Sequence, residues 1–205
     1  MMWPWGHLAF AYLVFAAYLR VRGRRPTEAT ALLVALGSQT PDLIDKPLAW
    51  TLPVLPSGRS LAHSLVVVGP LLGVAYLLAR RRDRRREAGG ETDGGTPATR
   101  RRRATAPLVG AFALGTVTHS LGDALYPLSQ LNVEFVRFLA WPVLPIVGYD
   151  DGGFVAHIAR LQFSPMLAFE FLLVAAAVVV WRADGSPGLA TVRAWSTRLV
   201  RAVGQ

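Results

Sequence analysis

Hydrophobic residues in this chain are gathered into long stretches that carry few formal charges, separated by short polar or strongly basic segments. A helix needs about 20 predominantly apolar residues to cross the hydrocarbon core of a bilayer, and somewhat shorter stretches are also found. This pattern predicts an all-α integral membrane bundle of about five transmembrane spans, at residues 5–19, 26–44, 60–79, 106–121 and 161–181.

The segments between and after these stretches are expected to behave differently. Residues 80–105 are polar, rich in glycine and strongly basic, which predicts a disordered loop. Residues 135–147 are apolar but are interrupted by Pro142 and Pro145, so we expect them to lie in the membrane interface or to re-enter it without crossing. The chain then divides into a bundle at residues 1–182 and a basic amphipathic tail helix at residues 183–205, suited to an anionic membrane surface.

Composition supports a membrane protein and narrows its chemistry. Hydrophobic residues make up 52% of the chain and charged residues only 17%, which excludes a large soluble catalytic domain. The sequence contains no cysteine, so disulfides, thiolate zinc sites and cysteine nucleophiles are excluded. Any bound metal must therefore be held by histidine, aspartate or glutamate.

The basic residues are distributed unevenly about the predicted spans. Of the 22 lysines and arginines, eighteen fall in the segments at residues 20–25, 80–103 and 182–201, which lie on one side of a five-span bundle. Basic residues remain on the cytoplasmic side, so the N-terminus is predicted outside and the C-terminus in the cytoplasm of an inner membrane. The arginine runs are then topology signals, and the expected partners are membrane lipids and not nucleic acid.

Most polar residues near the span ends fall on the opposite, outer side. They come from four predicted spans and combine imidazole, carboxylate and guanidinium groups: His7, Asp42, Asp45, Arg59, His63, His119 and Asp123. Spacings of three or four residues put both members of a pair on one helical face, as for Asp42 with Asp45 and His119 with Asp123. Histidine nitrogen and carboxylate oxygen suit Zn²⁺ best, with Mn²⁺, Fe²⁺ or Mg²⁺ as alternatives.

Glu170 lies midway along the last predicted span, where an ionised carboxylate is costly. We expect it to face the bundle interior, protonated or hydrogen-bonded, and it is not included among the metal ligands.

The polar residues occur in four blocks whose order is informative: Gly6-His7, the segment from Gly37 to Asp45, the segment from Arg59 to Ser64, and the segment from His119 to Asp123. In this order they resemble the membrane-bound metal-dependent hydrolase family, the YdjM-like inner-membrane proteins. The resemblance implies a small helical membrane protein with hydrolase activity. The family is also distantly similar to zinc-dependent phospholipase C, which implies that His119 and Asp123 are ligands and that the substrate is a phosphoester.

The functional hypothesis is metal-dependent hydrolysis of a phosphoester or lipid-like substrate at the outer face of the membrane. Asp45 is a candidate general base, or a carboxylate bridging two metals, and Arg59 would hold an anionic substrate group. The predicted metal ligands are His7, Asp42, Asp45, His63, His119 and Asp123. Two alternatives use the same features: a metal or proton transporter, and a non-catalytic membrane organiser acting through the basic loop. The sequence does not determine the oligomeric state.

The asymmetry of basic residues generates a topology prediction. Reporter fusions after residue 92 and at residue 205 should report the cytoplasm, and a fusion near residue 150 should report the outside, because basic segments resist translocation. Phosphatase and fluorescent-protein reporters at the same three positions measure both outcomes. An external signal at residue 92 would reverse the predicted orientation.

Overall fold

The computed structural model describes residues 2–88, 104–147, 153–159 and 161–203. These residues form helices joined by turns and contain no strand, which confirms the predicted all-α class. In chain order the elements are α1 (Pro4–Val21), α2 (Glu28–Gly37), α3 (Thr40–Trp50), α4 (Leu65–Ala88), α6 (Ala106–Ser129), the 3-10 helix η1 (Val133–Ala140), α7 (Gly153–Ala159), α8 (Pro165–Ala183) and α9 (Leu189–Val203).

Several helices begin at residues that satisfy their first backbone N–H groups. The side chain of Thr27 accepts from the backbone N–H of Thr30, whose own side chain accepts from the N–H of Thr27, a reciprocal cap for α2. Ser164 caps α8 through Leu167, and Pro165 follows at the first helical position. The starts of α2 and α8 are thus set by local sequence.

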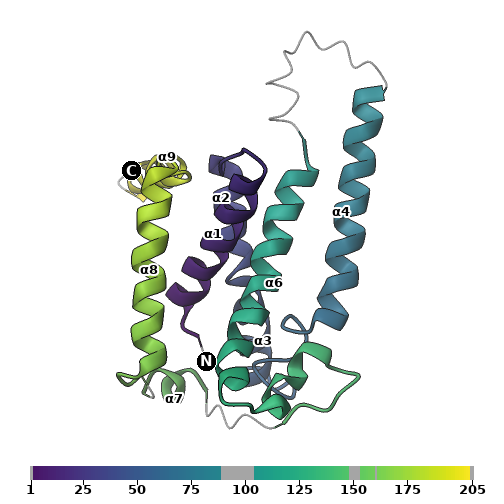
Figure 1. Ribbon diagram of the computed structural model, residues 1–205, viewed down its shortest axis with the longest axis vertical. Helices are drawn as coiled ribbons and strands as arrows, with labels where there is room; N and C mark the ends of the chain where they lie inside the picture. Colours follow the sequence, from purple (N-terminus) through teal and green to yellow (C-terminus); the bar gives the residue numbers. More distant parts are fainter. Residues whose placement is uncertain (1, 89–103, 148–152, 160, 204–205) are drawn as a thin grey trace.

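The long helices lie side by side, with shorter elements at both ends (Figure 1). Helix α6 packs against α1, α2 and α4, and α8 packs against α1. Elements α3, η1 and α7 lie at the end where the chain begins, which we call the cluster end. The α1–α2 turn, the last turns of α4 and helix α9 lie at the opposite end, which we call the arginine end.

Helices α2 and α6 approach so closely that two glycines are required between them. A Cβ atom on Gly37 would lie 2.2 Å from the backbone oxygen of Phe112, and one on Gly115 would lie 2.3 Å from that of Val34. Neither position can take a larger residue unless the helices move apart. The apolar core beside this contact includes Phe15 and Val34.

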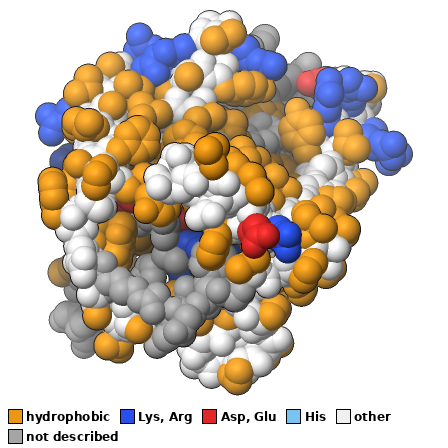
Figure 2. All heavy atoms as spheres, turned by 60° about the horizontal axis from the view of Figure 1, so that its bottom comes forward, with side chains coloured by type: hydrophobic (Ala, Val, Ile, Leu, Met, Phe, Trp, Pro, Cys, Tyr) orange, Lys and Arg blue, Asp and Glu red, His pale blue; other side chains and the backbone are white. Residues whose placement is uncertain are grey.

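The molecule exposes many large apolar side chains on its long helices and buries several ionisable ones. Large apolar side chains on α4 and α8 face outward, with Leu71 65% and Leu172 70% exposed, whereas the side chains of His63, His119 and Glu170 are completely buried. Figure 2 shows hydrophobic side chains over much of the described surface at the cluster end, beside backbone and other side chains. A bundle that hides polar groups and exposes apolar ones is suited to a lipid surrounding.

Two of the described helices, α6 and α8, are long and apolar enough to cross a membrane. The five-span bundle is therefore not confirmed. The predicted span at residues 26–44 is divided into α2 and α3, neither of which is long enough to cross. The predicted span at residues 60–79 becomes helical only at Leu65, because the preceding residues turn inward to form part of the polar cluster.

Other predicted segments also have different boundaries. Helix α4 continues through Ala88, so residues 80–88 are helical, and residues 89–103 of the predicted loop lie outside the described residues. Within residues 135–147, the structure has the end of η1 followed by turns. The predicted tail helix is present as α9, with Trp195 and Leu199 both more than 60% exposed.

The glycine contact generates a stability prediction. Gly115→Ala should destabilise the bundle by about 1–3 kcal/mol, because the added methyl overpacks the backbone of α2. Gly73→Ala on α4 is the matched control, since a Cβ atom there meets nothing within 4 Å and alanine favours helix. Thermal unfolding in detergent should show a lower Tm for Gly115→Ala alone; an equal Tm in both variants would contradict the requirement for glycine.

Candidate metal centre

The polar residues singled out in the sequence come together at the cluster end. They are contributed by α1, α3, the turn that precedes α4, and α6: His7; Asp42 and Asp45; Arg59 and His63; His119 and Asp123. Their side chains range from fully buried to 12% exposed. The cluster is thus an enclosed site built from distant segments.

His63 lies between the two aspartates of α3. Its Nδ1 is 2.8 Å from Asp45 Oδ2, and its Nε2 is 3.5 Å from Asp42 Oδ1. A carboxylate accepts hydrogen bonds, so Nδ1 carries the proton toward Asp45, and in the neutral ring Nε2 bears a lone pair. The two carboxylates therefore meet opposite nitrogens of one imidazole and do not converge on a single point.

Asp45 also holds the backbone of the turn that carries His63. Its carboxylate accepts hydrogen bonds from the backbone N–H groups of Ser60, Ala62 and His63, over 2.8–3.2 Å. Both oxygens are thereby occupied. In this geometry Asp45 orients His63, an arrangement common around metal-bound imidazoles.

The ring of His119 is likewise held by a hydrogen bond from its Nδ1 atom. Its Nδ1 lies 2.6 Å from the backbone oxygen of Ser38, which can only accept, so Nδ1 donates and Nε2 faces the cluster. The close approach of α2 and α6 brings the backbone oxygen of Ser38 next to the His119 ring. Both imidazoles thus turn their Nε2 atoms inward.

Three ligand atoms converge as a result. The Nε2 atoms of His63 and His119 are 3.1 Å apart, and Asp42 Oδ1 lies 3.5 Å and 3.6 Å from them. Asp42 Oδ1 accepts no hydrogen bond from the described residues. Tetrahedral ligands at zinc distances of about 2.0–2.1 Å are roughly 3.3 Å apart. The three residues therefore fit a small divalent cation.

His7, Asp123 and Arg59 form the adjoining half of the cluster. His7 Nε2 lies 3.4 Å from Asp123 Oδ1, and the ring of His7 stacks on that of His119 with centroids 3.7 Å apart. Asp123 Oδ2 accepts from Arg59 Nε at 2.5 Å. His7, His119 and Asp123 make a second possible ligand group, but His119 offers only Nε2 to either group. The two groups thus compete for one nitrogen.

Two cations balance part of the negative charge of the cluster. Lys46 Nζ contacts Asp42 Oδ2 at 2.5 Å, and Arg59 pairs with Asp123. Burial opposes the ionisation of Asp42, but the neighbouring imidazoles of His119 and His63, together with Lys46, hold the pKa of Asp42 well below its usual range. Burial also disfavours a charged His63, but the carboxylates of Asp42 and Asp45 outweigh this and raise the pKa of His63.

The 3-10 helix η1 covers this end of the bundle. The ring of Phe138 is buried and meets that of His63 edge-on, with centroids 6.0 Å apart, and the guanidinium of Arg59 lies over the same ring. Ser64 Oγ donates to the backbone oxygen of Trp141, which ties the following turn to the start of α4. The apolar cover keeps the polar cluster away from its surroundings.

Three contributors to the site were not predicted from the sequence. Ser38 acts through its backbone oxygen, which no side-chain pattern reveals. Lys46 stands four residues after Asp42, a helical ion-pair spacing that could have signalled its role. The backbone N–H of Met2 donates to Asp123, which depends on the position of the chain before α1.

Glu170 is buried as predicted. Its carboxylate accepts from the backbone N–H of Trp3 at 3.1–3.2 Å, so it ties the beginning of the chain to α8 beside the cluster. It belongs to neither possible ligand group.

The family of this chain is shown by its match to a family model. No curated protein and no solved structure matches the chain. A family model does match, over residues 1–186, and this match extends well beyond the last of the four sequence blocks. The family name and the two apolar helices together indicate a membrane location. The chain belongs to the YdjM inner membrane protein family.

Proposed function

We propose that this protein is a membrane-embedded metal-dependent hydrolase. The observation that carries the proposal is the convergence of His63 Nε2, His119 Nε2 and Asp42 Oδ1 within 3.6 Å of one another. Two lone pairs 3.1 Å apart repel unless a positive charge lies between them. The raised pKa of His63 favours a proton in this place in the metal-free protein, and a divalent cation would take the place of that proton.

Zinc is the favoured ion because two imidazoles and one carboxylate match its usual ligands in catalytic sites. Such an ion supplies Lewis-acid chemistry and lowers the pKa of water, which is what hydrolysis near neutral pH needs. The proposed ligands are Asp42, His63 and His119, with His7 and Asp123 alongside. Asp45 then holds His63 in its binding orientation, and a further role as general base is not required by the geometry.

The charges of the site favour an anionic substrate. The three aspartates carry one more negative charge than Lys46 and Arg59 carry positive charge. A bound divalent cation would therefore leave the site with one net positive charge. Arg59 is buried beside Asp123, where its guanidinium can meet a phosphoryl group near the metal ligands. The apolar surface around the cluster, including Leu131 and Val143, suits a lipid-like phosphoester approaching from the membrane. We place this chemistry at the outer face, as the distribution of arginines predicts.

A transporter would need polar groups along a path through the bundle. Among the described residues, the hydrophobic core between the cluster and the arginine end includes Phe15, Leu19 and Val34, and the polar side chains buried on this stretch are threonines, such as Thr116. The histidines and most of the buried carboxylates gather at the cluster end, which favours a hydrolytic site over a conduction path.

The ligand assignment generates a metal-content prediction. Asp42→Ala, His63→Ala and His119→Ala should each lose most of the bound zinc and the hydrolytic activity together, because each removes one of three converging ligands. Elemental analysis of the purified proteins measures the metal, and bis(p-nitrophenyl) phosphate and phosphatidylglycerol micelles serve as substrates.

Glu134→Ala is the matched control, since this carboxylate is 63% exposed and pairs only with Arg137 among the described residues. It should keep both zinc and activity. Full zinc occupancy in Asp42→Ala and His119→Ala would overturn the shared site. Full occupancy without hydrolysis of either substrate in the unaltered protein would leave a metal site and reject the tested hydrolase activity.

The orienting role of Asp45 generates a second prediction. Asp45→Asn should bind zinc about 10–100-fold more weakly, as expected when the partner of a metal-binding histidine is lost. It should also lower the Tm of the metal-free protein more than Asp42→Asn does, because Asp45 accepts from three backbone N–H groups as well as His63. Zinc titration and thermal unfolding measure the two effects. A larger loss of metal-free stability in Asp42→Asn would contradict this division of roles.

A further inference from the structure

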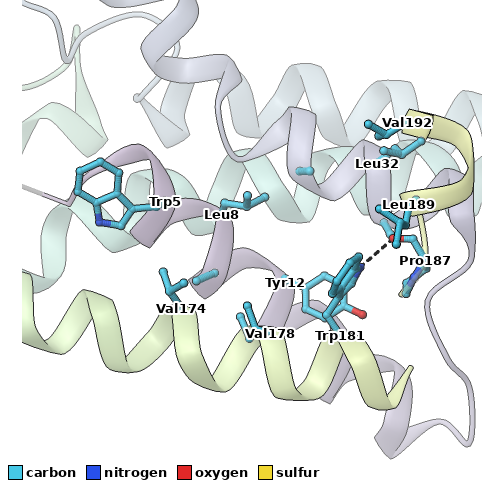
Figure 3. A pocket seen from close by; sticks show the side chains of 15 residues that line it. Trp5, Leu8, Tyr12, Leu32, Val174, Val178, Trp181, Pro187, Leu189 and Val192 are labelled. Atoms are coloured by element: carbon cyan, nitrogen blue, oxygen red, sulfur yellow. Dashed lines mark hydrogen bonds between the residues drawn. The ribbon is translucent and has the colours of Figure 1, made fainter. Parts of the chain in front are cut away.

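A second feature of the molecule is an apolar pocket of about 340 Å³ on the opposite side of α1 from His7. It lies between α1, α2, α8 and α9 (Figure 3). Trp5, Leu8 and Tyr12 line one wall, whereas Val174 and Val178 line the facing wall on α8. The volume is at the small end of the range for ligand pockets.

The shape and lining of the pocket suit a hydrocarbon chain. Trp5 and Tyr12 are seven residues apart on α1, which places them about 10 Å apart along the helix axis, so the pocket is elongated. The hydroxyl of Tyr12 donates to Asp184, and the indole N–H of Trp181 donates to the backbone oxygen of Pro187. These polar groups are thus already engaged, and the lining presents mainly apolar surface.

The pocket is open to the exterior of the bundle. Leu8 and Val178 line it and are each 43% exposed. In a membrane this opening faces lipid tails, so a chain can enter sideways from the bilayer. At the arginine end the turn between α8 and α9 closes over it, where Gly188 has a φ of +92° and lies against Leu32.

The surroundings of the closed end are strongly basic. Residues 20–28 and 182–201 contain eight arginines and only two carboxylates. Arg20 pairs with Asp184, and Arg25 donates to the backbone oxygen of Ala183, so both side chains gather around the end of α8. An anionic group at this end of an apolar chain would complement the excess of positive charge.

We propose that this pocket binds one acyl chain of an anionic phospholipid, with the phosphate of its headgroup among the arginines at the end of α8. The lipid is a resident ligand held separately from the proposed metal centre, because Trp5, Leu8 and Tyr12 face away from the side of α1 that carries His7. Its effect is to join α1, α2, α8 and α9 at the arginine end.

The test uses the full chain in detergent, with phosphatidylglycerol and phosphatidylcholine of identical acyl chains as probes. Native mass spectrometry should show one phosphatidylglycerol retained per chain, bound at least tenfold more tightly than phosphatidylcholine. Arg20→Gln with Arg25→Gln should reduce that preference toward equality. Equal retention of the two lipids by the unaltered protein would overturn the assignment of the headgroup site.

A pair of neighbouring substitutions on α8 tests the pocket itself. Val178→Trp fills the pocket and should abolish lipid retention, whereas Val179→Trp adds the same bulk at a residue that is 68% exposed and outside the lining, and should retain the lipid. Leu8→Trp fills the same space from α1 and serves if Val178→Trp aggregates. Unchanged retention in the pocket-filled proteins would overturn the proposal, as would a dimer that depends on the pocket and carries no lipid.

Discussion

The contact between α2 and α6 determines where the rest of the site can form. Gly37 and Gly115 let the two backbones meet with no side chain between them. Ser38 follows Gly37, and His119 lies one helical turn after Gly115, so the backbone oxygen of Ser38 comes within hydrogen-bonding reach of the His119 ring. A wider separation would leave His119 free to rotate, and its Nε2 would no longer be fixed toward His63. The close packing at Gly37 and Gly115 thus fixes the orientation of the His119 imidazole.

The orientation of His63 depends on the buried carboxylate of Asp45 and not on a close contact between helices. Asp45 satisfies three backbone N–H groups of a turn that has no regular structure. Those donors would otherwise be buried without partners, which is costly in an apolar surrounding. The same carboxylate then receives the ring N–H of His63. One group therefore both stabilises the irregular backbone and selects the tautomer that turns Nε2 inward.

The helical class could be predicted from sequence because it depends on local patterns, and apolar stretches identified the long helices. The polar blocks do lie together at the cluster end, but the five-span topology from which this was predicted is not confirmed, and Arg59 and His63 stand in a turn and not on a helix. The predicted span at residues 26–44 ran through the break between α2 and α3, although polar residues from Ser38 to Thr40 interrupt the apolar stretch where α2 ends. The pairing of side chains between different segments could not be predicted from spacing. The spacing of Asp42 and Asp45 suggested one shared cation, whereas in the structure the two carboxylates lie beside different nitrogens of His63.

Placing this cluster at one end of the bundle reconciles two opposing requirements. A metal centre needs ionisable groups in a dry, rigid surrounding, but each such group is expensive within the hydrocarbon core. Here the carboxylates come from the short helix α3 and from the far portion of α6, close to the end of the molecule, and each pairs with a cation or an imidazole. The long helices beyond them are packed through apolar side chains. The polar groups are therefore shielded by η1 and the helix ends without interrupting the apolar core on which the bundle depends.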